Sequence, residues 1–248
     1  MRYSHLLHLS RKKNILSNKK YWISIATVAF LLLIVIFLVI FSNLNSFDLL
    51  VGFLVSLFRV SVAYLIALVL ALTIALLITS SAKIENIMLP IFDVFQSFPS
   101  FALFPALVIA FHSTELIIIL VLVIALIWPM MFSIIGGIKN RREDLEEAAT
   151  IFGAKGFKRL NYFTLPELSP SITTGSIVGW GDAWELIIGA ELLVNTNIGI
   201  GHYLGNLGKN GENFLLTLGI VALMLLLFLI NKILWLPMLY KTTKYQSE

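Results

Sequence analysis

The sequence contains no cysteine, so neither a disulfide framework nor a thiolate metal site can form in this chain. Charged residues are also scarce, since they make up 13% of the 248 residues, whereas a typical soluble domain carries about 25%. Hydrophobic residues reach 58%. This balance excludes an ordinary soluble domain and is typical of a chain that lies in lipid.

A phosphate-binding loop is missing as well. The nearest candidate, Gly199-Ile200-Gly201 through Gly208-Lys209, has the wrong spacing and no Ser or Thr after the lysine. We therefore expect no ATP hydrolysis by this chain, and the energy for any transport would come from a partner protein or an ion gradient. The four histidines are scattered and do not stand at metal-ligand spacing with acids. The sequence thus predicts no metal, no cofactor and no catalytic residue.

Apolar runs of the length that a membrane requires are abundant. A helix needs roughly 20 apolar residues to span a bilayer, and six segments meet or approach this length. They predict an all-α, polytopic membrane protein with six transmembrane helices. The six segments are 22–41, 60–79, 88–111, 116–135, 171–194 and 214–236.

The third run differs from the others because it contains Pro90, Pro99 and Pro105. Proline removes backbone hydrogen bonds, so we expect this span to be kinked or built from two pieces. Between the runs, residues 42–58 are expected to form a mixed connector. The Gly- and Asn-rich residues 195–213 are expected to form a loop.

Lysine and arginine gather on one side of this topology. Six stand in residues 1–20 and six in the central polar segment, and 16 of the 18 fall on that side in all. Cytoplasmic loops carry such an excess, so both termini and the central loop are predicted to be cytoplasmic in a cell membrane. The charges would then contact lipid headgroups and not nucleic acid. No cleavable signal peptide is expected, because the first run, which starts near Tyr21, is too long and lacks a cleavage pattern.

The chain is expected to divide into four parts. A basic N-terminal segment (1–20) precedes the first helix and its outer connector (21–56). The transmembrane core (57–236) contains the cytoplasmic loop 136–168, and a cytoplasmic tail (237–248) follows.

The central loop holds the strongest motif. Residues 144–152 favour a helix, with acids near its start and alanines at close-packing positions. Gly153 would end that helix or let another surface approach its backbone, and Leu165-Pro166 restarts the chain before the next span. The segment suits docking into a groove on a soluble partner. A surface helix without a partner is the alternative.

This pattern resembles the EAA signature of permease subunits in bacterial and archaeal binding-protein-dependent ABC importers. Three residues separate Ala149 from Gly153, and eleven separate Gly153 from Leu165, as in that signature. The resemblance covers about residues 57–236, although His112 stands where these permeases often have glycine. Arg59 to Leu77 and Phe98-Pro99 through Pro105 look like the family's first two core spans. Gly179-Trp180 through Glu191, with Gly199-Ile200-Gly201, look like the nitrate, sulfonate and taurine branch.

The resemblance implies a type I importer fold and a division of labour. Two permease subunits, identical or related, would form a path at their interface, and an extracytoplasmic binding protein would deliver a small polar or anionic solute. Two cytoplasmic ATPase subunits would grip the central loop. The residues assigned to this coupling are Glu146, Glu147, Ala148, Ala149, Gly153, Ala154, Leu165 and Pro166.

The fifth run carries three acids, which are costly in a membrane and usually face a bundle interior or a water-filled cavity. Asp182 and Glu185 share one helix face because they are three residues apart, and Glu191 lies near the outer end. With Trp180 and Trp184, these acids could line a solute path. The alternative is structural, namely acids that fix helix packing and tryptophans at an interface.

Two other function classes stay open at this point. In an ion-coupled secondary transporter, Asp182 and Glu185 would bind protons or sodium, but such proteins commonly show two related halves, and no internal repeat is visible here. A membrane-embedded enzyme would need a catalytic cluster near one interface, and the sequence contains none. An importer permease is therefore the leading interpretation.

Overall fold

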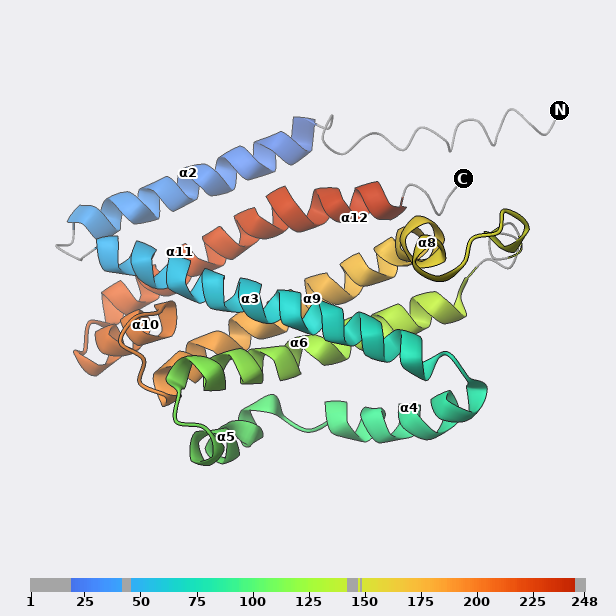
Figure 1. The fold of residues 1–248 in the computed structure, drawn as a ribbon. Coiled ribbons are helices and arrows are strands. Elements are labelled where there is room, and N and C mark those ends of the chain that lie inside the picture. Colours follow the sequence, from blue (N-terminus) through green and yellow to red (C-terminus); the bar gives the residue numbers. More distant parts are fainter. Residues whose placement is uncertain (1–18, 42–45, 142–146, 148, 244–248) are drawn as a thin grey trace.

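The computed structural model describes residues 19–41, 46–141, 147 and 149–243 (Figure 1). Every regular element in these ranges is a helix or a helical turn. The long helices run side by side along one axis (Figure 1). The all-α prediction is therefore confirmed.

Three long helices form the centre of the molecule: α3 (Ser46–Ile78), α6 (Thr114–Lys139) and α9 (Leu165–Leu193). Small residues at four-residue spacing let membrane helices approach one another closely. On α3 a buried stripe of this kind consists of Ala63, Ala67, Ala71 and Ala75. The large side chains that fill the core come mainly from α6, namely Ile118, Leu122, Leu126, Met130 and Ile134.

The third predicted span is built from two pieces, as expected. Helix α4 (Ala82–Gln96) is followed by a 3₁₀ turn, η2 (Ser100–Leu103), and by α5 (Phe104–Ala110). The two parts are bent by 82° at the break. Pro99 precedes η2 and Pro105 stands in the first turn of α5, where the missing N–H is tolerated.

Two segments expected to be irregular are helical, and those predictions are wrong. Helix α3 begins at Ser46, inside the expected connector, because Leu49 and Phe53 are buried and extend the core face of the helix. The expected loop contains α10 (Ile200–Lys209). Its glycines lower helix propensity, but packing of Leu204 and Leu207 into the core overrides this.

The remaining helices lie along one side of the bundle (Figure 1). Helix α11 (Asn213–Ile230) continues through a π-helical turn, η4 (Asn231–Trp235), into α12 (Leu236–Thr243). Helix α2 (Lys19–Phe41) lies beside α11. The Tyr21 hydroxyl donates a hydrogen bond to the backbone carbonyl of Lys232, which fixes the start of α2 against η4.

Three helices in the described part of the chain are long and apolar enough to cross a membrane: 47–78, 114–139 and 213–242. The bent pair of α4 and α5 makes a fourth if it is one span. Helix α9 has 29 residues but is less apolar, and α2 contains a shorter apolar stretch, Tyr21–Ile34. The multi-pass character is thus supported, while the count of six spans stays a prediction.

The bundle has two distinct ends (Figure 1). The start of α2, the end of α6, the short helix α8 (Gly156–Arg159) and the end of α12 lie at one end, called the loop end below. Helix α10 and the turn between α5 and α6 lie at the other, called the α10 end. Which end faces the cytoplasm stays a prediction.

Candidate coupling surface and candidate solute path

The segment between α6 and α9 carries the predicted coupling residues. Glu146 and Ala148 lie outside the described residues. Glu147 is exposed and Ala149 is buried, on a helical turn that continues to Ile151. The chain then passes through α8 and a π-helical turn, η3 (Leu160–Thr164), directly into α9.

Gly153 ends this helical turn. Its N–H donates to the carbonyl of Thr150, and the N–H of Ala154 donates to the carbonyl of Ala149, both at 3.0 Å. This pair of bonds is the Schellman pattern, in which the residue after the helix adopts a positive φ, and Gly153 has φ +69°. Among the described residues, and apart from Gly153 itself and its two chain neighbours, no atom lies within 4 Å of a Cβ built at Gly153. Within the chain, the glycine is therefore required by backbone conformation and not by lack of space.

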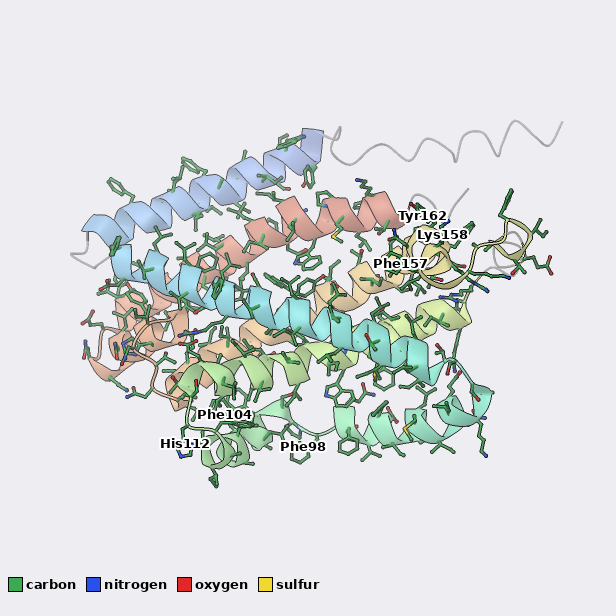
Figure 2. The ribbon with its side chains drawn as sticks, viewed as in Figure 1. Phe98, Phe104, His112, Phe157, Lys158 and Tyr162 are labelled. Carbon is green, nitrogen blue, oxygen red and sulfur yellow. The ribbon has the colours of Figure 1, made fainter. Side chains whose placement is uncertain are left out.

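Large apolar side chains project from this segment at the loop end. Four of them are between 71% and 82% exposed, and Figure 2 shows Phe157 and Tyr162 beside Lys158 at this end of the bundle. Apolar groups that gather on one exposed surface commonly mark an interaction site. We call this set the coupling surface; its members are Ile151, Phe152, Phe157 and Tyr162.

A cleft of ≈ 1200 Å³ lies next to this surface, between the end of α6, η3, the start of α9 and α12. Pro166, in the first turn of α9, lines the cleft, and Leu165 is half-buried. At its edge Arg141 Nε lies 3.5 Å from a carboxylate oxygen of Glu167. This ion pair ties the end of α6 to the start of α9 on either side of the coupling segment.

Asp182 and Glu185 both lie on an exposed face of α9. Together they line a cavity of ≈ 440 Å³ at the break between α4 and η2. Within the described residues, neither carboxylate has a hydrogen-bond or ion-pair partner. The two acids therefore share one face, as their spacing predicts, and that face borders a cavity.

Trp180 and Trp184 line a second cavity, of ≈ 670 Å³, between α9, α10 and α11. Glu185 borders both cavities. Trp184 is almost fully buried and stacks on Phe53, with ring centroids 5.5 Å apart. Both tryptophans therefore line this cavity and also pack against the hydrophobic core.

Glu191 lies elsewhere, in a buried polar network near the α10 end. Its side chain is 0% exposed, and its carboxylate accepts hydrogen bonds from Arg59 Nη1 at 2.8 Å, Ser56 Oγ at 2.6 Å and the Gly201 N–H at 2.7 Å. Ser56 Oγ in turn accepts from the N–H of Ile200 at 2.9 Å. Glu191 thereby holds the first turn of α10 against α3 and α9.

Arg59 is the centre of this network and is only 4% exposed. Besides Glu191, it donates to the carbonyl of Ile198 at 2.8 Å and makes a two-pronged ion pair with Glu115 at the start of α6. Burial of charge without pairing is costly, so these partners are needed. From the sequence, Arg59 was placed in the topology and at the start of the segment that resembles the family's first core span, but its partners Ser56 and Glu115 were missed. A lone arginine at the start of an apolar run was the available signal.

Comparison with known proteins agrees with this architecture. The family described as "Binding-protein-dependent transport system inner membrane component" matches residues 63–235. The nitrate import permease protein NrtB of Leptolyngbya laminosa is 31% identical over 71% of this chain and 63% of its own length. The taurine transport system permease protein TauC of Escherichia coli is 27% identical over 71% and 64%. The bicarbonate transport system permease protein CmpB of Synechococcus elongatus is 26% identical over 60% and 54%.

The chain thus spans less than two thirds of the length of these relatives. The matched residues nevertheless include α6, the coupling segment, α9, α10 and α11, and the second half of α3 from residue 63. The family match also agrees with the apolar helices of the bundle. The chain therefore belongs to the family of binding-protein-dependent transport system inner membrane components, which has the type I ABC permease fold.

Proposed function

We propose that this chain is the membrane-spanning permease subunit of an ABC importer, coupled through its central segment to a separate ATPase. The observation that carries the proposal is the coupling surface, four large apolar side chains exposed at one end of the bundle. Such a surface is unfavourable in water. A soluble partner that covers it would gain roughly 1.5–3 kcal/mol for each fully buried side chain.

The partners follow from the family and its importer arrangement. They are a second permease subunit, two cytoplasmic ATPase subunits and an extracytoplasmic solute-binding protein. The named relatives carry nitrate, taurine or bicarbonate, which supports a small polar or anionic solute. Asp182 and Glu185 would border the path of this solute, because they lie unpaired on an exposed face of α9.

The proposed coupling needs an element that a partner can grip. The Schellman turn at Gly153 ends the helix sharply, and the exposed side of Gly153 leaves its backbone open to another surface. Glu147 is exposed on the same segment and offers a charge to basic or amide groups of the partner. The segment enters α9 without an intervening loop, so a force on it would reach the candidate path directly.

Co-purification with the ATPase tests this proposal. The double variant Phe152→Ala with Phe157→Ala should lower the amount of ATPase recovered with the permease by at least about tenfold, since two buried side chains are lost. Phe214→Ala is the matched control, because Phe214 is 66% exposed at the start of α11, next to α10. Unchanged recovery with the double variant would overturn the assignment of the coupling surface.

A second candidate function rests on the two unpaired acids. In an ion-coupled secondary transporter, Asp182 and Glu185 would bind protons or sodium near the membrane midplane. The two functions differ in their energy source. Uptake that survives removal of the ATPase but stops when the ion gradient is dissipated would favour the secondary transporter, and the opposite result would favour the importer.

A further inference from the structure

Helix α4 lies at the edge of the bundle and runs from the loop end to the break before η2 (Figure 1). None of its 15 residues is buried. One face contacts the bundle, where Met88 and Phe92 pack against the hydrophobic core. The rings of Phe92 and Phe95 also lie against Trp128 of α6, with centroids 5.9 and 6.5 Å away. The rest of the helix surface is left to lipid, water or another chain.

Two different stripes run along this uncovered surface. Residues at alternating spacings of three and four lie on one side of a helix, and α4 contains two such sets that differ by one position. Every residue in both sets is exposed. The apolar stripe consists of Ile84, Ile87, Ile91 and Val94. The polar stripe consists of Lys83, Asn86, Asp93 and the C-cap residue Ser97, with Pro90 between them.

Lipid tails can cover the apolar stripe but not the polar one. Helix α4 and the segment after the break are together apolar enough to form one broken membrane span. Ionisable side chains within a span are costly and usually face the bundle interior or a water-filled cavity. Asp93 accepts a hydrogen bond from the Gln96 side chain at 2.6 Å, whereas a carboxylate can accept about four. The polar stripe therefore needs water or polar groups beside it.

Pro90 adds a backbone group to the same requirement. Proline has no N–H, so the carbonyl four residues earlier, that of Asn86, loses its usual helical donor. Backbone polar groups at membrane depth must be satisfied by protein or by water in a cavity. The backbone and the side chains of the polar stripe thus both require a polar environment.

The polar stripe begins at the loop end and ends at the candidate solute path. Gln96 and Ser97 line the cavity of ≈ 440 Å³ at the break, which Asp182 and Glu185 of α9 also line. From Lys83 to Ser97 the stripe extends over about 21 Å at 1.5 Å per residue. It therefore connects this cavity with the end of the bundle that carries the coupling surface.

From these features we propose that the polar stripe of α4 lines a water-filled section of the solute path, between the cavity at the break and the loop end. The apolar stripe beside it faces lipid. This inference rests on the proposed function and names residues that contact the solute on its way through the membrane. The amide of Asn86, the carboxylate of Asp93 and the hydroxyl of Ser97 can hydrogen-bond a small polar solute in place of water.

Cysteine substitution tests the inference, because the chain contains no cysteine of its own. Asn86→Cys and Asp93→Cys each place a single thiol on the polar stripe. Ile87→Cys and Val94→Cys are the matched controls, since each lies one residue further along and differs in depth by only about 1.5 Å. The permease complex is reconstituted in lipid nanodiscs and treated with a charged methanethiosulfonate reagent, with and without ATP.

The polar-stripe thiols should react at least about tenfold faster than their controls in at least one of the two conditions. The thiolate is the reactive form of cysteine, and apolar surroundings disfavour it. In proteoliposomes, modification of Asn86→Cys should also lower ATP-driven uptake at least about fivefold, because the attached group obstructs the path, whereas modification of Ile87→Cys should not. If Asp93→Cys fails to assemble on gel filtration, the pair at Asn86 and Ile87 decides the test alone.

Two results would overturn the inference. One is equal rates within a pair, or a faster reaction at the apolar position. The other is a disulfide between two copies of Asn86→Cys that do not react with the reagent, which would show that the polar stripe packs against a second permease. Fast reaction at the polar stripe together with uptake that continues without the ATPase would count against the proposed function alone and would support the wetted stripe.

Discussion

Glu191→Ala should destabilise the protein far more than removal of any exposed acid. The substitution leaves the Gly201 N–H without its acceptor and removes the fully buried partner of Arg59. Glu115→Ala is the matched control. It also removes a carboxylate that pairs with Arg59, but the Glu115 side chain is 56% exposed.

The magnitude follows from the partners that remain. Breaking a buried ion pair by removing one member costs about 3–5 kcal/mol. Arg59 keeps Glu115 and the carbonyl of Ile198 in Glu191→Ala, so we expect the lower end, about 3 kcal/mol. For Glu115→Ala the partner is solvated and Arg59 keeps Glu191, so the expected loss is about 0–1 kcal/mol.

Thermal unfolding of the permease purified in detergent measures the difference. The five tryptophans supply a fluorescence signal, and Trp184 lies in the core. For a chain of this length, 1 kcal/mol shifts Tm by about 2–4 °C. Glu191→Ala should therefore lower Tm by about 6–12 °C and Glu115→Ala by less than about 4 °C.

The same measurement separates two roles of Glu191. The buried hydrogen bonds of Glu191 make it a packing residue, whereas the sequence also allowed Glu191 to line the solute path. If Glu191→Ala unfolds at the wild-type temperature and yet abolishes transport, the packing argument is wrong. Equal Tm shifts in the two variants would refute the distinction between the buried and the exposed partner.

Three further outcomes are expected. Gly153→Ala should modestly lower the amount of ATPase recovered with the permease, because a side chain at φ +69° costs about 1–2 kcal/mol. Gly153→Trp should abolish this recovery, and Glu147→Ala should only reduce it. Co-purification from membranes measures all three variants. Asp182→Asn and Glu185→Gln should reduce uptake without loss of assembly, as judged by solute accumulation and by gel filtration of the complex, and loss of assembly would favour a packing role. A reporter fused at Lys139 should behave as cytoplasmic, and an extracytoplasmic signal would refute the predicted orientation.

The sequence predicts the long helices well because their signal is local. An apolar run of about 20 residues has few alternatives to a membrane span. The prolines in the third run likewise predict that this span is broken. Helix α10 carries no such signal, because glycine and asparagine mask the buried face formed by Leu204 and Leu207. The early start of α3 at Ser46 is hidden for a related reason, since Asp48 interrupts the apolar pattern.

The polar network could not be derived from the sequence for a different reason. Ser56 and Arg59 are separated from Glu191 by 135 and 132 residues, and their contact depends on how α3 and α9 pack. Spacing along one helix, by contrast, places Asp182 and Glu185 on one face without any tertiary information. Local pattern thus predicts which residues share a surface, while packing decides whether an acid such as Glu191 faces a path or a partner.

Helix α9 connects the two ends of this molecule (Figure 1). Its 29 residues span about 43 Å at 1.5 Å per residue. It begins directly after the coupling segment, carries Asp182 and Glu185 along its length, and ends beside Glu191, which is locked to α3 and α10. The α10 end is held by the buried Arg59–Glu191 ion pair, while the loop end presents an exposed apolar surface. Under the proposed function, a partner that displaces the loop end would therefore tilt α9 about its α10 end. The acids lie between the two ends, so under the proposed function the same motion would change the shape of the cavity that they border.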